Sequence, residues 1–176
     1  MSEFPHLTAT GTARMVDVSD KDVTRREATA TGQVRLSAEA VAALRDNAVP
    51  KGDALAVGRI AGIQGAKRTP DLIPLCHPLP LTGVDLDLAV IDTGVTITAT
   101  VRTTGRTGVE MEALTAVSVA ALSVIDMIKA IDRSAVITDV RVEAKSGGRR
   151  GDWRRTTAGA DGADGLDRAD AGGDSV

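Results

Sequence analysis

The sequence predicts an α+β protein of the ferredoxin-like, split βαβ class: an antiparallel sheet with helices packed on one face, plus an N-terminal extension. Two observations predict it. Apolar and polar residues alternate over several short segments, as in half-buried strands, and one long segment repeats apolar residues at helical spacing. From residue 28 onward the segments follow in the order strand, helices, strand, strand, helix, strand.

The first half of the chain predicts one strand and two helices. Residues 28–36 alternate between apolar and polar side chains, which is typical of a half-buried strand. Ser37 is suited to cap a helix over 38–46. A second helix is predicted over 53–68, and it ends before Pro70 because the residue before a proline avoids helical geometry.

Three glycines share one face of the second helix. Gly58, Gly62 and Gly65 recur at helical spacing, and each costs up to about 1 kcal/mol relative to alanine. We expect the close approach of another backbone to compensate for this cost. The glycine face is also a candidate contact between copies of the chain.

The second half of the chain predicts a β-hairpin and a last strand. Residues 84–90 and 95–102 alternate in polarity on either side of the turn sequence Asp-Thr-Gly at 92–94. A last strand is expected at about 136–144, and a further strand near Arg14–Val18 would precede the first one.

A long helix is predicted between the hairpin and the last strand, over residues 108–131. Thr107 and Glu110 fit a capping box at its start. Its apolar stripe consists of Met111, Leu114, Val117, Ala121, Leu122, Ile125 and Ile128.

Composition divides the chain into three parts. We expect a flexible N-terminus over 1–11, a single catalytic domain over 12–153 and a disordered tail rich in Gly, Ala and Asp over 154–176. The formal net charge is −3, but residues 156–176 contain five Asp and one Arg, so the remainder carries +1. Such a domain offers no broad basic surface for duplex DNA.

Several classes of protein are disfavoured. Phe4 and Trp153 are the only aromatic residues, which argues against stacking platforms for single-stranded nucleic acid. Cys76 is the only cysteine and there are two histidines, so neither an internal disulfide nor a Cys/His zinc site is expected within one chain. No stretch approaches the apolar length of a membrane span and no signal peptide is recognised, so we expect a soluble cytoplasmic protein.

The segment 71–81, DLIPLCHPLPL, is a candidate site because its prolines restrict the backbone around His77. A histidine held in this way is suited to acid or base catalysis. A purely structural histidine is the alternative. The adjacent Cys76 has no base at a fixed spacing, and an inert buried thiol is the favoured interpretation.

Asp126 and Lys129 are three residues apart on one face of the long helix, among apolar neighbours. A surface ion pair worth less than about 1 kcal/mol is the simpler interpretation. The alternative is a carboxylate that accepts a proton and an ammonium that binds phosphate. Lys51 precedes the second helix, where a cation is unfavourable for the helix dipole unless an anion binds there.

Two further groups have weak signals. Glu110 and Glu112 lie in the first turn of the long helix, where acids complement the dipole, and that interpretation normally holds. Residues 145–151, KSGGRRG, combine glycines with Lys145 and Arg149 and have the character of an anion-binding loop, without the spacing of a P-loop.

Together these segments resemble the cyclic pyranopterin monophosphate synthase family of molybdenum cofactor biosynthesis. The resemblance covers residues 12–153. It rests on MVDVSDKDVTRREA at 15–28, KGDALAVGRIAGIQGAKRTPDLIPLCHPLPLTGV at 51–84, TGVEMEALTAVSVAALSVIDMIKA at 107–130 and KSGG at 145–148. The second and third segments are long and very specific.

The resemblance implies a ferredoxin-like fold, a homohexamer built as a trimer of dimers, and a lyase reaction. The substrate would be (8S)-3′,8-cyclo-7,8-dihydroguanosine 5′-triphosphate, a cyclic dihydro-GTP, and the products cyclic pyranopterin monophosphate and pyrophosphate. No cofactor is implied, and any Mg²⁺ would bind the substrate's phosphates. Neither nucleic acid nor a membrane is an expected partner.

The resemblance also implies roles for individual residues. The catalytic residues would be Asp126, Lys129 and Lys51. The substrate-binding residues would be Leu75, Cys76, His77, Glu110, Met111, Glu112, Arg26, Lys21, Lys67, Lys145 and Arg149. No metal ligand is implied.

The chain departs from the family's pattern at two places. Arg149 and Arg150 stand where the glycine-rich loop usually continues with lysine and serine, which keeps a positive charge but changes the geometry. Ile125 and Ile128 replace an aromatic residue and a cysteine that are common near the catalytic helix.

Two rival functions use the same residues. A Schiff-base lyase would use Lys51 or Lys129 as its nucleophile. A non-catalytic regulatory module would bind purine nucleotides without turnover and would not need Asp126.

Overall fold

The computed structural model describes residues 12–149 and 151–156. The N-terminus expected to be flexible and most of the expected tail lie outside these residues. The elements are β1 (Thr24–Arg35), α1 (Ala38–Arg45), α2 (Ala54–Lys67), α3 (Thr69–Leu72), β2 (Leu81–Ile91), β3 (Gly94–Gly105), α4 (Glu110–Ile128), β4 (Val136–Ser146) and β5 (Trp153–Arg154).

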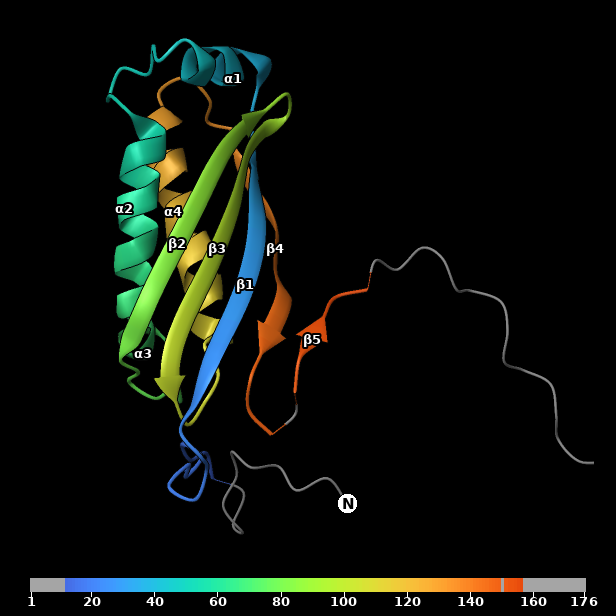
Figure 1. The fold of residues 1–176 in the computed structure, drawn as a ribbon. Helices are drawn as coiled ribbons and strands as arrows, with labels where there is room; N and C mark the ends of the chain where they lie inside the picture. Colours follow the sequence, from blue (N-terminus) through green and yellow to red (C-terminus); the bar gives the residue numbers. More distant parts are fainter. Residues whose placement is uncertain (1–11, 150, 157–176) are drawn as a thin grey trace, which may run out of the picture.

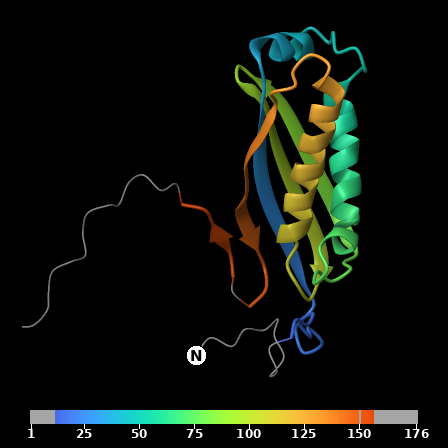
Figure 2. The ribbon, with the colours of Figure 1, turned by 180° about the vertical axis from the view of Figure 1, so that it is seen from behind.

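The strands form one antiparallel sheet in the order β2-β3-β1-β4-β5. The long helices α2 and α4 lie side by side on one face of the sheet, and α1 lies across one end of the molecule (Figures 1 and 2). The order of β2, β3, β1 and β4, with helices after β1 and β3, is the split βαβ arrangement. The α+β, ferredoxin-like prediction is therefore confirmed.

The core between the sheet and the two helices is aliphatic. Ile97 and Val101 of β3 pack with Val117 and Val124 of α4, and all four are fully buried. The opposite face of the sheet is polar: the hydroxyl groups of Thr29 and Thr100 lie 3.0 Å apart. The sheet is thus half-buried, as the alternation in the sequence predicts.

The glycine face of α2 packs against α4 of the same chain. A Cβ at Gly62 would lie 2.8 Å from the carbonyl oxygen of Ala116, and a Cβ at Gly65 would lie 2.8 Å from the side chain of Val119. The expected close approach of another backbone is confirmed. In the single chain, α4 rather than a second copy covers this face.

The two helix starts differ from each other. Ser37 caps α1 as predicted, and its hydroxyl accepts the Ala40 N–H at 3.3 Å. The capping box of Thr107 and Glu110 is wrong: Val109 precedes α4 without a side-chain cap. The carboxylate of Glu110 binds Lys145 at 2.7 Å instead and so does not close the box.

Two boundaries also differ from expectation. The strand expected at 14–18 is wrong: only an isolated bridge residue, Ala13, occurs next to this described segment, and the Val16 carbonyl oxygen lies beside the His77 ring. α2 ends before Pro70 as predicted, but the proline itself lies in the first turn of α3, where a proline is tolerated.

One helix contradicts the expectation that no stretch approaches the apolar length of a membrane span. α4 is long and apolar enough by length and composition alone. Its most apolar window is 56% buried inside the protein, against the sheet and α2. The helix is apolar because it forms the centre of the core.

Beyond β4 the chain turns back as a short edge strand. Trp153 pairs with Lys145, and Arg154 pairs with Ala144. The Arg155 N–H donates to the Glu143 carbonyl oxygen at 2.8 Å, and its guanidinium lies 5.6 Å from the centre of the Trp153 ring. The hydrogen-bonded chain therefore continues through Arg155, two residues past the expected end of the domain.

Candidate functional site

Asp126 joins two lysines at the C-terminal end of α4. Its Oδ1 accepts from the Lys129 ammonium at 2.6 Å, and its Oδ2 accepts from the Lys51 ammonium at 2.9 Å. Lys51 also donates to the Asp126 carbonyl oxygen at 2.8 Å. We call these three residues the α4 C-terminal cluster. The structure thus brings the three predicted catalytic residues together.

The Asp126 carboxylate lies between two positively charged lysines. Hydrogen bonds from Lys129 and Lys51 lower the pKa of Asp126 to about 2. The carboxylate is therefore ionised at neutral pH and holds two cations at a surface that is open in the single chain. The two ammonium groups and the one carboxylate leave a net charge of +1, which favours an anion over a cation at this surface.

A small apolar cluster separate from the main core places Lys51 near Asp126. Val49, Ala54, Met127 and Ile128 form its buried centre. Val49 precedes Lys51 by two residues, while Met127 and Ile128 directly follow Asp126. Packing between these neighbours brings the loop that carries Lys51 against the end of α4.

A second group of predicted residues lies at the opposite end of α4. Lys145 of β4 binds the carboxylate of Glu110 at 2.7 Å, and Glu112 is only 3% exposed. Burial, with the charge of Glu110, raises the pKa of Glu112 to about 7. Near neutral pH the Glu112 carboxyl group is thus present in both protonation states and is suited to donate or accept a proton.

The predicted loop residues also lie at this end. Burial first, and then the charge of Glu112, raises the pKa of the Cys76 thiol, which favours the interpretation as an inert thiol. A ring nitrogen of His77, Nε2, lies 2.8 Å from the carbonyl oxygen of Val16. Leu75 and Met111 are exposed.

The glycine-rich loop after β4 packs on Arg26. A Cβ at Gly148, whose φ is +83°, would collide with the Arg26 guanidinium. Arg26 Nε donates to the Gly105 carbonyl oxygen at 2.9 Å, and Arg149 Nη2 donates to the Asp20 carbonyl oxygen at 3.1 Å. We group Cys76, His77, Glu110, Glu112, Lys145, Arg26 and Arg149 as the α4 N-terminal cluster.

The structure does not bring the two clusters together. Fourteen residues of helix separate Glu112 from Asp126, which is roughly 21 Å at about 1.5 Å per residue. Lys67 is exposed at the last residue of α2, and Lys21 is half-buried in the mostly exposed segment before β1. One chain therefore presents two separate clusters of predicted site residues.

Two side chains near these clusters, Arg106 and Asp132, were not predicted from the sequence to have a role. Arg106 donates to the Ser19 carbonyl oxygen and so fastens the segment before β1. Asp132 follows the α4 C-terminal cluster and is only 5% exposed. The pattern Asp-x-Ser at 132–134, repeated at 17–19, was the available signal, because such an aspartate binds the serine two residues on.

No group of three or more His, Cys, Asp or Glu residues that could hold a metal ion occurs within residues 12–149 and 151–156.

Known proteins of similar sequence share nearly the whole chain. Cyclic pyranopterin monophosphate synthase of Streptomyces griseus is 71% identical over 155 residues, which are 88% of each protein. The protein of that name from Nocardioides is 62% identical over 162 residues, covering 88% of this chain and 99% of the relative. Cyclic pyranopterin monophosphate synthase 2 of Mycobacterium tuberculosis is 60% identical over 153 residues, covering 87% and 92%.

The sequence model of the MoaC family matches residues 15–148. This range includes both clusters except Arg149. The match to this model over most of the chain, together with relatives that are 60–71% identical, shows that the chain belongs to the MoaC family.

Proposed function

We propose that this protein is an enzyme of molybdenum cofactor biosynthesis, a lyase that converts the cyclic dihydro-GTP to cyclic pyranopterin monophosphate and releases pyrophosphate. The names of its relatives support an enzyme that forms cyclic pyranopterin monophosphate. The single observation that carries the proposal is the contact of Lys51, Asp126 and Lys129. This contact places two cations, which would bind a triphosphate, next to a carboxylate that would take part in proton transfer.

The cations would act on the phosphates. Lys51 and Lys129 would hold the triphosphate and stabilise the negative charge that develops as pyrophosphate leaves. Lys145 and Arg149, from the glycine-rich loop, would bind further phosphate oxygens. Lys67 and Lys21 would add to the positive field around the substrate.

The acids and the histidine would move protons. Ring opening, pterin closure and formation of the cyclic phosphate each require proton transfer. Asp126, His77 and Glu112 are the candidate donors and acceptors. Glu112 is suited to this role near neutral pH, because its pKa is raised to about 7.

A Schiff-base lyase is the less favoured alternative. A lysine attacks a carbonyl through a free nitrogen lone pair. Both Lys51 and Lys129 instead donate hydrogen bonds to the Asp126 carboxylate, so neither nitrogen is directed at a carbonyl substrate. A lyase of that class would trap a carbonyl substrate on reduction with borohydride.

The direct test is mass spectrometry of the products formed from the cyclic dihydro-GTP. We expect the mass of cyclic pyranopterin monophosphate and one equivalent of pyrophosphate. Binding of the substrate without turnover would support a regulatory module instead. A different product would refute the assignment of the reaction.

We further propose that the working enzyme is a homohexamer, a trimer of dimers, whose sites combine the two clusters from neighbouring copies. The roughly 21 Å along α4 is too long for one small substrate to touch Glu112 and Asp126 of the same chain. If both act on one substrate, a second copy must supply one of them. We expect this assembly in the cytoplasm.

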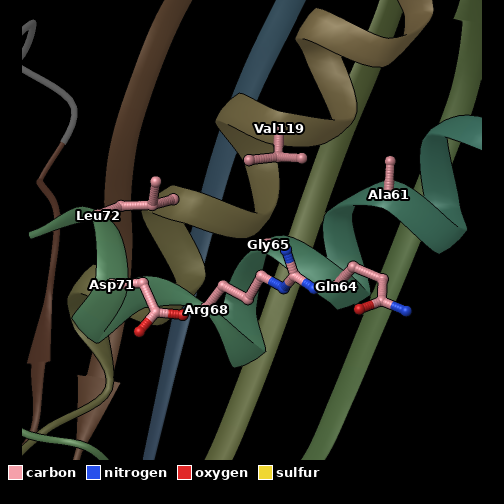
Figure 3. A pocket seen from close by; sticks show the side chains of 7 residues that line it. All are labelled: Ala61, Gln64, Gly65, Arg68, Asp71, Leu72 and Val119. Carbon is pink, nitrogen blue, oxygen red and sulfur yellow. The ribbon is translucent and has the colours of Figure 1, made fainter.

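The outer face of α2 and α4 is the candidate contact. Ile60 and Leu122 are 64% and 59% exposed, and Leu72 of α3 is 57% exposed. A groove of about 540 Å³ lies beside this face, and Figure 3 shows the side chains that line it, Leu72 and Val119 among them. The groove is lined by Ala61, Gln64, Gly65, Arg68, Asp71, Leu72 and Val119. Apolar side chains exposed in this way favour burial against a second copy.

Mixing two inactive variants tests the shared site. Glu112→Ala and Asp126→Ala are purified separately and then mixed under conditions that allow subunit exchange. A shared site predicts recovery of activity, because some pairs combine one intact half from each chain. If native mass spectrometry shows mixed hexamers and activity stays at the level of the single variants, the shared site is refuted.

A further inference from the structure

Asp132 is a buried carboxylate outside both clusters, in the turn between α4 and β4. One oxygen, Oδ2, accepts the Ser37 N–H at 2.7 Å. The other, Oδ1, accepts the N–H and the hydroxyl group of Ser134 at 2.8 and 2.7 Å. Its hydrogen bonds thus join two parts of the chain that are 95 residues apart.

These hydrogen bonds lie at the junction that supports Lys51. Ser37 follows Leu36, and Ser134 precedes Ala135. Both apolar neighbours pack against the small cluster whose centre includes Val49 and Ile128. The carboxylate therefore holds together two of the segments that surround the base of the Lys51 loop.

Other polar ties of this region run to the turn between β2 and β3, where Arg45 pairs with Asp92 and the Leu36 N–H donates to the Thr93 carbonyl oxygen, and not to the turn after α4. α1 contacts the sheet only at its end and lies over the end of α4 where the chain turns back (Figure 1). The loop from Asp46 to Asp53 leaves α1 and carries Lys51. A shift of α1 relative to α4 would move Lys51 away from Asp126.

We propose that Asp132 is a positioning residue, whose buried carboxylate joins the start of α1 to the turn after α4 and thereby holds Lys51 against Asp126 and Lys129. The carboxylate accepts all three hydrogen bonds at once. An asparagine in its place has only one accepting oxygen and directs an NH₂ group at one of its present donors.

Competitive labelling of lysines tests this geometry without substrate. The assembled protein reacts with a limiting amount of acetic anhydride, and peptide mass spectrometry gives the ratio of labelling at Lys51 to that at Lys67. In Asp132→Asn we expect the ratio to rise several-fold, because the Lys51 ammonium is released from Asp126. Hydrogen exchange should increase over residues 46–53.

A second pair of variants, both at Ser37, tests the proposal even if Asp132→Asn does not fold. Ser37 has φ −64°, which a proline also adopts. Ser37→Pro removes the N–H that Asp132 accepts together with the hydroxyl, whereas Ser37→Ala keeps this N–H and removes only the hydroxyl, which caps α1 and makes a lesser contact with Asp132. We expect the labelling ratio to rise in Ser37→Pro and to stay near the parent value in Ser37→Ala.

A core variant separates positioning from general loss of stability. Val101→Ala removes two methyl groups from a fully buried side chain in the sheet, far along the chain from Asp132. Its labelling ratio is compared with that of the Asp132 and Ser37 variants under conditions in which the proteins have lost the same amount of stability. If Asp132→Asn and Ser37→Pro show the same labelling ratio as Val101→Ala, the positioning role is refuted.

The effect on turnover rests on the proposed function. We expect kcat of Asp132→Asn to fall by about ten-fold or more, with a smaller change in KM, because displacement of a catalytic group by about 1 Å costs up to roughly 100-fold. Full activity of Asp126→Asn would refute the proposed site while the labelling result could still stand. A raised labelling ratio with an unchanged kcat would refute the link between Asp132 and turnover.

Discussion

The Lys51 ammonium donates both to the carboxylate and to the main-chain carbonyl oxygen of Asp126, at 2.9 and 2.8 Å. Because one of these acceptors belongs to the backbone, Lys51 keeps a partner when the carboxylate is altered. The side chain of Asp126 can therefore be changed without releasing Lys51 completely, which makes it the most informative position for a test of catalysis.

Asp126→Asn should fold normally and lose most of its turnover. A loss in kcat of about 100-fold or more is expected, because a proton-transfer group typically contributes 10²–10⁴-fold. Tm should change little, since the ion pairs are solvent-exposed. The matched control is Asp92→Asn, which removes an exposed ion pair with Arg45. Equal kcat values for the two variants would exclude a catalytic role for Asp126.

Glu112→Gln should change how stability depends on pH. The fold raises the pKa of Glu112 from an ordinary 4.5 to about 7, so the folded state binds the proton more tightly than the unfolded state. The stabilisation is complete below pH 4.5 and is lost as the pH rises through 7. Relative to Glu112→Gln, the parent protein should lose roughly 3 kcal/mol between pH 4 and 8.

Urea unfolding at a fixed protein concentration measures this difference. The concentration must be fixed because assembly contributes to stability. Parallel curves of unfolding free energy against pH for the two proteins would show that the Glu112 carboxyl group is not perturbed in the folded state.

Gly62→Ala should destabilise the protein even though alanine favours a helix. The added Cβ would lie 2.5 Å from Leu86 and 2.8 Å from the Ala116 carbonyl oxygen. We expect a loss of about 1–3 kcal/mol, which is typical of an overpacked core. Gly58→Ala should cost less, since its nearest neighbours are side-chain atoms of Leu88 and Val124 at 3.0 and 3.2 Å. A more stable Gly62→Ala would contradict the close packing of α2 on α4.

Gly148→Ala should weaken substrate binding by displacing the Arg26 guanidinium from the glycine-rich loop. KM should rise several-fold while Tm changes little. Gly151→Ala is the matched control, because Gly151 also has a positive φ, +66°, but has no atom within 4 Å of the added Cβ. The same rise in KM in both variants would mean that backbone strain, rather than Arg26, is responsible.

Secondary structure could be predicted from the sequence wherever local chemistry decides it. The hydroxyl group of Ser37 caps α1 in the expected way. Thr107 and Glu110 have equally good local chemistry, yet Glu110 binds Lys145, a residue 35 positions away. No local pattern reveals such a partner, and the capping box failed for that reason.

In the candidate site, too, local contacts could be predicted from the sequence and contacts between distant residues could not. Spacing on one helix was enough to pair Asp126 with Lys129, because residues three apart are neighbours on a helix. The contact of Lys51 with Asp126 spans 75 residues and depends on how Val49 packs against Met127 and Ile128. Asp132 was missed because its burial depends on the same packing.

Trp153 lies in the two-residue strand β5, outside the aliphatic core, and the chain contains no tyrosine and no other tryptophan. The intrinsic fluorescence of the protein therefore comes from one indole ring beside the Arg155 guanidinium and next to the glycine-rich loop. A change in emission during heating or titration would report detachment of β5 or movement of that loop, while the sheet and α4 stay spectroscopically silent. Global unfolding is better followed by far-ultraviolet circular dichroism, and a difference between the two signals would measure how independently this edge of the sheet opens.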